Sequence, residues 1–245
     1  MTVPPPAVFD DIDLRLYAIV DPETSGGRPL PELAKVVAAG GATLVQLRDK
    51  KSGTADMISL ACAVKAALPP QVPLIVNDRI DVALASGADG VHLGQEDGNV
   101  QEARERLGPG PFIGLTVQTL DHAWAAPLAT IDYVGIGGVF ATSSKNNPRP
   151  PIGTAGLRKI VDVFRYRIGN FPMCAIAGIT KENAASVIDA GVDGVSVISA
   201  LSLAPNPEAA ARELRNVVDE ALRVRAPLVP DTRELFGDKA WEHHH

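Results

Sequence analysis

A five-residue segment, Gln-Leu-Arg-Asp-Lys at 46–50, combines two cations and an amide within an apolar stretch of the chain. Side chains of a β-strand alternate between its two faces, so Gln46, Arg48 and Lys50 share one face. A planar guanidinium beside an ammonium is typical of sites that bind a diphosphate. The same charges could instead be the solvated end of a strand. We favour the diphosphate site, because the polar residues at the other strand ends match it.

Two carboxylates, Asp78 and Asp97, each follow an apolar run that reads as a strand. Neighbouring parallel strands would bring them together at one edge of a sheet. Mg²⁺ prefers oxygen ligands and is commonly held by one or two carboxylates plus substrate phosphate oxygens. Each Asp could also cap the helix that follows it. Because Arg48 and Lys50 are predicted to lie beside the pair, we favour a Mg²⁺ site.

Further polar groups follow the later strands. Thr142, Ser144 and Lys145 lie in a Gly/Ser/Asn-rich loop, where Lys145 could contact phosphate or be a solvated lysine. A Schiff-base lysine would be expected within a strand, in a desolvated place. Gly178 and the pair Ile198-Ser199 end the last two strands, where barrels often bind phosphate through backbone N–H groups. Gly178 could also simply be a turn glycine.

Short β-branched runs alternate with helical stretches, eight of each, which indicates parallel βα units. We expect an α/β fold: a single (β/α)8 TIM barrel over residues 14–224, an arm over 1–13 and a tail over 225–245 that ends in a probable tag remnant. The predicted strands are 14–20, 44–47, 74–76, 90–93, 112–117, 133–136, 173–177 and 194–198. The predicted helices are 31–39, 54–67, 80–85, 100–107, 120–128, 154–167, 181–190 and 207–223.

A weak repeat supports the barrel. Residues 39–45, 86–91 and 190–195 share a helix end, a glycine suited to the left-handed conformation, and a strand start. These are αβ turns, so the polar residues that follow the strands belong to the βα loops, which form the catalytic face of a barrel. An open doubly wound sheet would alternate in the same way, but it gathers its binding residues at one switch point. Here they follow at least six strands.

The composition narrows the class of protein. The chain has 23 Lys and Arg residues and 29 Asp and Glu residues, which gives a formal charge of -6. It therefore has no basic field to attract nucleic acid or a membrane surface. No window is apolar enough to span a membrane and no leader is visible, so we expect a cytoplasmic protein. Neither Cys62 nor Cys174 has a metal-ligand or Cys-x-x-Cys neighbourhood, and we expect both to be buried thiols.

Taken together, these segments resemble thiamine phosphate synthase, also called thiamine-phosphate pyrophosphorylase. The resemblance extends from about Leu14 to Ala221. It rests on Gln46-Leu47-Arg48-Asp49-Lys50, Val76-Asn77-Asp78-Arg79, Gly90-Val91-His92-Leu93-Gly94-Gln95-Glu96-Asp97, the Thr142-x-Ser144-Lys145 loop, Gly178 and Val197-Ile198-Ser199.

The resemblance implies a (β/α)8 barrel that joins 4-amino-5-hydroxymethyl-2-methylpyrimidine diphosphate to 4-methyl-5-(2-hydroxyethyl)thiazole phosphate and releases pyrophosphate. It assigns Asp78 and Asp97 to Mg²⁺. The implied ligands of the pyrimidine diphosphate are Gln46, Arg48, Lys50, Asn77 and Lys145. The implied contacts of the thiazole phosphate are Thr142, Ser144, Gly178, Ile198 and Ser199. Arg48, Lys50, Lys145 and Thr116 are the expected catalytic residues, and Thr116 is also expected to bind substrate.

Two positions depart from the family pattern. Thr116 replaces a usual Ser after the fifth strand, and Ala141-Thr142-Ser143-Ser144-Lys145 replaces a common Pro-Thr-x-Thr-Lys. A thiazole tautomerase of the same barrel family is the nearest rival, but it uses a His after the fifth strand, in the region where this chain reads Thr116-Val117-Gln118-Thr119. A non-catalytic phosphate-binding barrel is the other alternative. The sequence leaves a homo-oligomer open.

Overall fold

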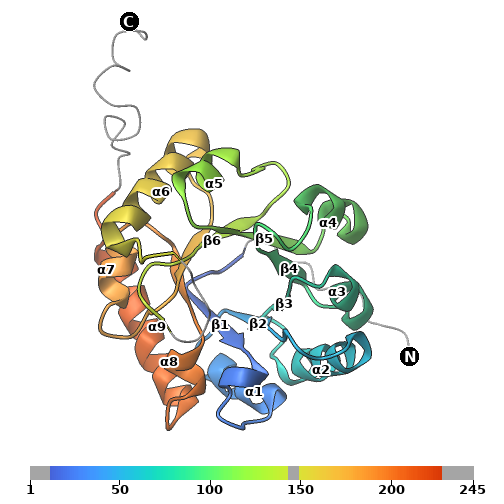
Figure 1. Ribbon diagram of the computed structural model, residues 1–245. Helices are drawn as coiled ribbons and strands as arrows, with labels where there is room; N and C mark the ends of the chain where they lie inside the picture. Colours follow the sequence, from blue (N-terminus) through green and yellow to red (C-terminus); the bar gives the residue numbers. More distant parts are fainter. Residues whose placement is uncertain (1–11, 143–148, 228–245) are drawn as a thin grey trace, which may run out of the picture.

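Eight parallel strands close into a ring, and helices surround it (Figure 1). The computed structural model describes residues 12–142 and 149–227. The strands are β1 (Leu16–Val20), β2 (Leu44–Leu47), β3 (Leu74–Asn77), β4 (Gly90–Leu93), β5 (Phe112–Val117), β6 (Tyr133–Ile136), β7 (Met173–Ile176) and β8 (Gly194–Val197). Each strand pairs with the next in sequence, and β1 pairs with β8. The predicted (β/α)8 barrel is therefore confirmed.

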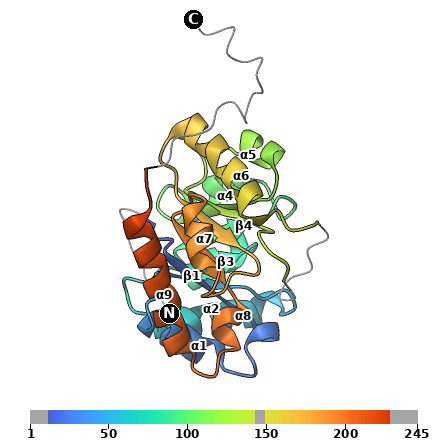
Figure 2. The ribbon, with the colours of Figure 1, turned by 90° about the vertical axis from the view of Figure 1, so that its left-hand side faces the viewer.

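The helices cover the outer face of the ring, as the side view shows for α7 and α9 (Figure 2). They are α1 (Leu30–Ala39), α2 (Thr54–Ala67), α3 (Ile80–Ser86), α4 (Val100–Leu107), α5 (Leu120–Ala125), α6 (Gly153–Ile168), α7 (Ala184–Asp189), α8 (Ser199–Ser202) and α9 (Pro207–Val224). A short 3-10 helix, η1, covers Pro22–Thr24. Helix α8 is an extra turn directly after β8. None of the described helices is long and apolar enough to cross a membrane.

Two apolar clusters hold the barrel together. The larger one lies between the outward strand residues and the helices, and includes Leu47, Val76 and Phe164. The smaller one fills the inside of the ring around Leu44 and Ile75. Strands that are buried on both faces are largely apolar, which explains the Val/Ile/Leu runs of the sequence.

Three predicted features needed correction. Cys62 is exposed, because the buried stripe of α2 is Met57, Ala61 and Val64 and Cys62 lies beside that stripe. Helix α5 ends at Ala125 instead of Leu128, because a residue that precedes proline, here Ala126, avoids the helical conformation. Helix α7 covers 184–189 instead of 181–190. The turn glycines behaved as predicted: Gly41, Gly87 and Gly191 all have positive φ.

Close contact between β8 and the start of β1 requires a glycine at 194. A Cβ atom there would lie 1.7 Å from the backbone oxygen of Leu14, which cannot move away as a flexible side chain can. We expect Gly194→Ala to lower the free energy of unfolding by about 3 kcal/mol, the upper part of the usual cost of overpacking. Urea unfolding measures this. Gly53→Ala is the control, because a Cβ at Gly53 meets nothing within 4 Å. Equal midpoints for the two variants would contradict the assignment.

Candidate active site

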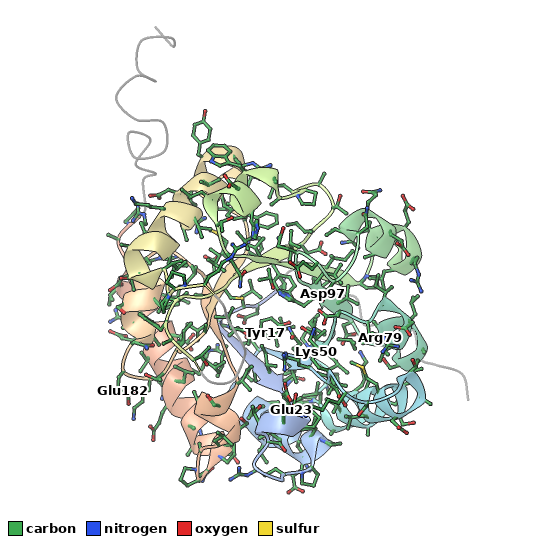
Figure 3. All side chains as sticks on the ribbon, viewed as in Figure 1. Tyr17, Glu23, Lys50, Arg79, Asp97 and Glu182 are labelled. Carbon is green, nitrogen blue, oxygen red and sulfur yellow. The ribbon has the colours of Figure 1, made fainter. Side chains whose placement is uncertain are left out.

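A cavity of about 240 Å³ lies inside the ring towards the carboxyl ends of the strands. All eight strands contribute to its wall, which is why residues far apart in the sequence meet there. Figure 3 shows Tyr17 near the centre of the ring with Lys50 and Asp97 to one side, whereas Glu182 lies at the outer edge of the molecule.

Most of the predicted site residues line this one cavity. From the first half of the barrel these are Gln46, Arg48, Asn77 and Thr116. From the second half they are Thr142, Gly178, Ile198 and Ser199. Lys50, Asp78 and Asp97 do not form its wall but gather beside it. Ser144 and Lys145 lie outside the described residues.

Arg48 is held by a residue that the sequence analysis did not identify. Its Nη1 donates to Oδ2 of Asp21, which follows β1 and is 1% exposed. Asp21 also accepts a hydrogen bond from the backbone N–H of Glu23, 2.8 Å away, at the start of η1. The side chain of Arg48 is 14% exposed. A buried carboxylate therefore fixes the direction of the guanidinium at the cavity wall, where a cation attracts an anionic ligand.

The two predicted metal carboxylates come together. Lys50 Nζ donates to Oδ2 of Asp78 and lies 3.8 Å from Oδ1 of Asp97. Asn77, which lines the cavity, donates from Nδ2 to the same Asp78 oxygen at 2.6 Å. The carboxylate pair thus adjoins the cavity through Asn77. In the described parts of the chain no cluster of three or more His, Cys, Asp or Glu could hold a metal ion, so this pair would need oxygen ligands from a substrate.

Asp78 has an unusual backbone and an unusual carboxyl group. Its φ of 61° lies in the left-handed region, which side chains other than Asn and Asp seldom enter. Its N–H donates to the backbone oxygen of His92 at 2.9 Å. Burial raises the pKa of Asp78, the Asp97 carboxylate raises it further, and Lys50 opposes both. The ionised form of Asp78 is therefore less favourable here than in water, in spite of Lys50.

Gly178 allows the loop after β6 to pack against the end of β7. Its φ is +65°, and a Cβ atom there would lie 2.4 Å from the backbone oxygen of Ala141 and 2.7 Å from Cβ of Phe140. The side-chain amide of Asn183 donates to the Gly178 oxygen at 2.9 Å. Thr142, which follows this loop, and Ser199, which begins α8, both line the cavity.

The inner end of the cavity carries a chain of hydrogen bonds. Gln46 donates to Tyr17, whose hydroxyl lies 2.9 Å from that of Tyr133. Nδ1 of His92 lies 3.1 Å from the Tyr133 hydroxyl, and its Nε2 lies 2.8 Å from Thr116 Oγ1. Burial raises the pKa of both phenols, so they stay protonated. The sequence had suggested no role for His92, and it had not singled out either tyrosine.

The comparisons with known proteins agree with this geometry. The family model described as "Thiamine monophosphate synthase" matches residues 16–201. The thiamine-phosphate synthase of Agrobacterium fabrum is 46% identical over 220 residues, which cover 89% of this chain and 100% of that protein. The one from Moorella thermoacetica is 44% identical, over 84% of this chain and 96% of that protein.

Solved structures show the same relationship. The thiamine phosphate pyrophosphorylase of Pyrococcus furiosus superposes with a TM-score of 0.75 at 38% identity, covering 86% of this chain and 98% of that one. A 3-hexulose-6-phosphate synthase superposes with a TM-score of 0.58 at 18% identity, over 83% of this chain and 99% of that one. At that identity the second likeness concerns the fold alone.

Proposed function

Since the chain belongs to the thiamine monophosphate synthase family, we propose that it joins 4-amino-5-hydroxymethyl-2-methylpyrimidine diphosphate to 4-methyl-5-(2-hydroxyethyl)thiazole phosphate, giving thiamine phosphate and pyrophosphate. One observation supports this above the others: an arginine, several hydroxyls and a glycine that come from different strands line a single cavity beside a carboxylate pair. We also expect the cytoplasm as its location. A homo-oligomer, which the sequence leaves open, stays a prediction.

In this proposal, the diphosphate binds where β2, β3 and β4 end. Arg48, oriented by Asp21, offers its guanidinium to the phosphate oxygens, and Lys50 and Asn77 lie beside the carboxylate pair. Asp78 and Asp97 would hold Mg²⁺, which when bound neutralises charge on the diphosphate oxygens. Two carboxylates that share one ammonium fit a divalent cation. Lys50 would add a further positive charge beside the leaving diphosphate.

The thiazole phosphate binds across the barrel, where β7 and β8 end. Gly178, Ile198, Ser199 and Thr142 line that side of the cavity. Backbone N–H groups after the last two strands are a common phosphate anchor in barrels of this type. With its phosphate fixed there, the thiazole ring extends into the cavity, and its nitrogen can reach the methylene carbon of the pyrimidine.

The chemistry we propose is dissociative. The bond between the methylene carbon and the diphosphate oxygen breaks, and its electron pair leaves with pyrophosphate. The electron-rich aminopyrimidine stabilises the resulting cation, and the lone pair of the thiazole nitrogen forms the new C–N bond. No base is required. The protein stabilises the leaving charge and orients the nucleophile, and the largely apolar wall of the cavity keeps water from capturing the cation.

Pyrophosphate release tests the proposal. The protein should release it only when both substrates and Mg²⁺ are present, with one thiamine phosphate formed per pyrophosphate. Isomerisation of a thiazole phosphate without the pyrimidine would show a tautomerase instead. Binding of thiazole phosphate without any pyrophosphate would show a non-catalytic barrel. Either result would overturn the proposed function.

Lys145 lies outside the described residues, and its role is predicted from the resemblance alone. We expect Lys145→Ala to lower kcat by about 100-fold, as loss of one group that stabilises the leaving charge usually does. The KM for thiazole phosphate should change much less. Steady-state kinetics with each substrate varied in turn measures both. Lys181→Ala is the control, because Lys181 pairs with Glu213 on the surface. Unchanged turnover in Lys145→Ala would refute this role.

A further inference from the structure

Ser196 carries a buried hydroxyl that the fold itself does not use. It lies on β8 beside Tyr17 of β1 and Ile176 of β7, and it is 3% exposed. Its Oγ has no hydrogen-bond partner among the described residues, although Ser196 lines the cavity. A buried polar group without a partner costs free energy, so a native protein keeps one mainly where something else completes it.

Position distinguishes Ser196 from the other groups of this kind. In the described segments, Thr24 Oγ1, Asp49 Oδ2 and Arg165 Nε are also buried without a partner, but none of these residues lines the cavity. Ser196 alone among them faces the space where a ligand would lie. Its hydroxyl can both donate and accept a hydrogen bond.

The surroundings of Ser196 fit a neutral polar ring and disfavour a phosphate. Burial raises the pKa of the neighbouring Cys174 thiol to about 12, so the thiol is neutral, as is the Tyr17 hydroxyl. Two of the cations predicted to bind phosphate, Arg48 and Lys50, instead follow β2, and each pairs with a carboxylate.

Ser196 could contact either the pyrimidine ring or the thiazole ring of the proposed substrates, and the reaction chemistry distinguishes the two. The thiazole nitrogen must keep its lone pair free to attack the methylene carbon, so a hydrogen bond to it would slow the reaction. The pyrimidine carries an amino group and two ring nitrogens, none of which forms the new bond. Its diphosphate is expected beside Asn77 and Lys50, and a ring attached to that group extends from there into the centre of the barrel.

We propose that the hydroxyl of Ser196 hydrogen-bonds the aminopyrimidine ring and so serves as a specificity residue at the inner end of the cavity. This inference rests on the proposed function. It adds a contact from β8 to a ring whose diphosphate lies on the opposite side of the barrel, so the ring would be held from two sides.

Ser196→Ala tests the inference. We expect the KM for the pyrimidine diphosphate to rise about tenfold, the usual value of one neutral hydrogen bond at a buried site. The KM for thiazole phosphate should stay within about twofold, because its phosphate anchor is untouched. Calorimetric titration with the pyrimidine diphosphate alone should show the same loss of affinity. Thermal stability should not fall, because the variant removes a polar group that has no partner in the protein.

The control is Thr24→Val, which removes another unpartnered hydroxyl outside the cavity and should leave both KM values unchanged. Equal affinity of Ser196→Ala and the parent protein for the pyrimidine diphosphate would overturn the inference, as would an effect confined to thiazole phosphate. The proposed function has its own test, and it would be wrong if the parent protein released no pyrophosphate. The titration still measures the Ser196 contact in that case.

Discussion

Asp78→Asn is expected to lower kcat about a thousandfold at saturating Mg²⁺ and substrates, because it removes half of the carboxylate pair proposed to hold the metal. The change preserves the shape of the side chain, and Asn adopts the left-handed backbone of residue 78 as readily as Asp. Loss of turnover would therefore report lost charge, not lost structure. Initial rates of pyrophosphate release over a range of Mg²⁺ concentrations measure the effect.

The same variant should be more stable than the parent protein when no metal is present. Burial, first of all, raises the pKa of Asp78, so the ionised carboxylate is less favourable in the folded protein than in the unfolded chain. That cost is present at neutral pH and disappears once the pH falls below the usual range of a carboxyl group, where both states are protonated. The gain in Tm should follow the same pH dependence.

Asp81→Asn is the matched control for Asp78→Asn. Asp81 lies three residues further on, pairs with Arg79 at the start of α3, and does not line the cavity. The pKa of Asp81 is lowered by its hydrogen bond to Arg79, so its replacement should reduce stability slightly and leave turnover unchanged. Full activity in Asp78→Asn would exclude this residue from the proposed metal site.

Arg48→Met should have the second largest effect, a loss of about 500-fold in kcat, since it removes the cation that is held most firmly at the cavity wall. It should also lower Tm, because Asp21 would remain buried without its partner. Arg48→Lys keeps the charge and should recover part of the stability. It should recover less of the turnover, because a lysine cannot reproduce the planar fork.

The control for Arg48→Met is Lys51→Met, which removes a nearby cation that is 74% exposed and pairs with Glu23. That variant should retain the turnover and stability of the parent protein. The diphosphate would have to bind elsewhere if Arg48→Met kept its kcat while losing only stability.

The sequence predicted the barrel well, because each βα unit carries a local signal. An apolar run, a polar strand end and a glycine turn are all visible within about 30 residues, as around Gln46 and Gly87. The start of α7 was less visible. Asn183 accepts from the Thr180 N–H and donates to Gly178, which ties residues 180–183 into a turn, so the helix starts only at Ala184.

The inner end of the cavity could not be predicted in the same way. Tyr17, Tyr133, His92 and Ser196 come from four strands, one residue from each, and no spacing in the sequence connects them. Each resembles an ordinary buried strand residue when it is considered alone. Only the closed ring brings Tyr17 beside Ser196, because it pairs the first strand with the last. Asp21 was missed for a similar reason, since its partner Arg48 lies one βα unit away.

A crystal structure of the protein with thiamine phosphate, pyrophosphate and Mg²⁺ tests the central claim most directly. We predict that both products occupy the single cavity, with the metal bound by Asp78, Asp97 and pyrophosphate oxygens, and with the thiazole phosphate group next to Gly178 and Ser199. Pyrophosphate or metal bound outside the cavity, away from Arg48 and the carboxylate pair, would contradict the account.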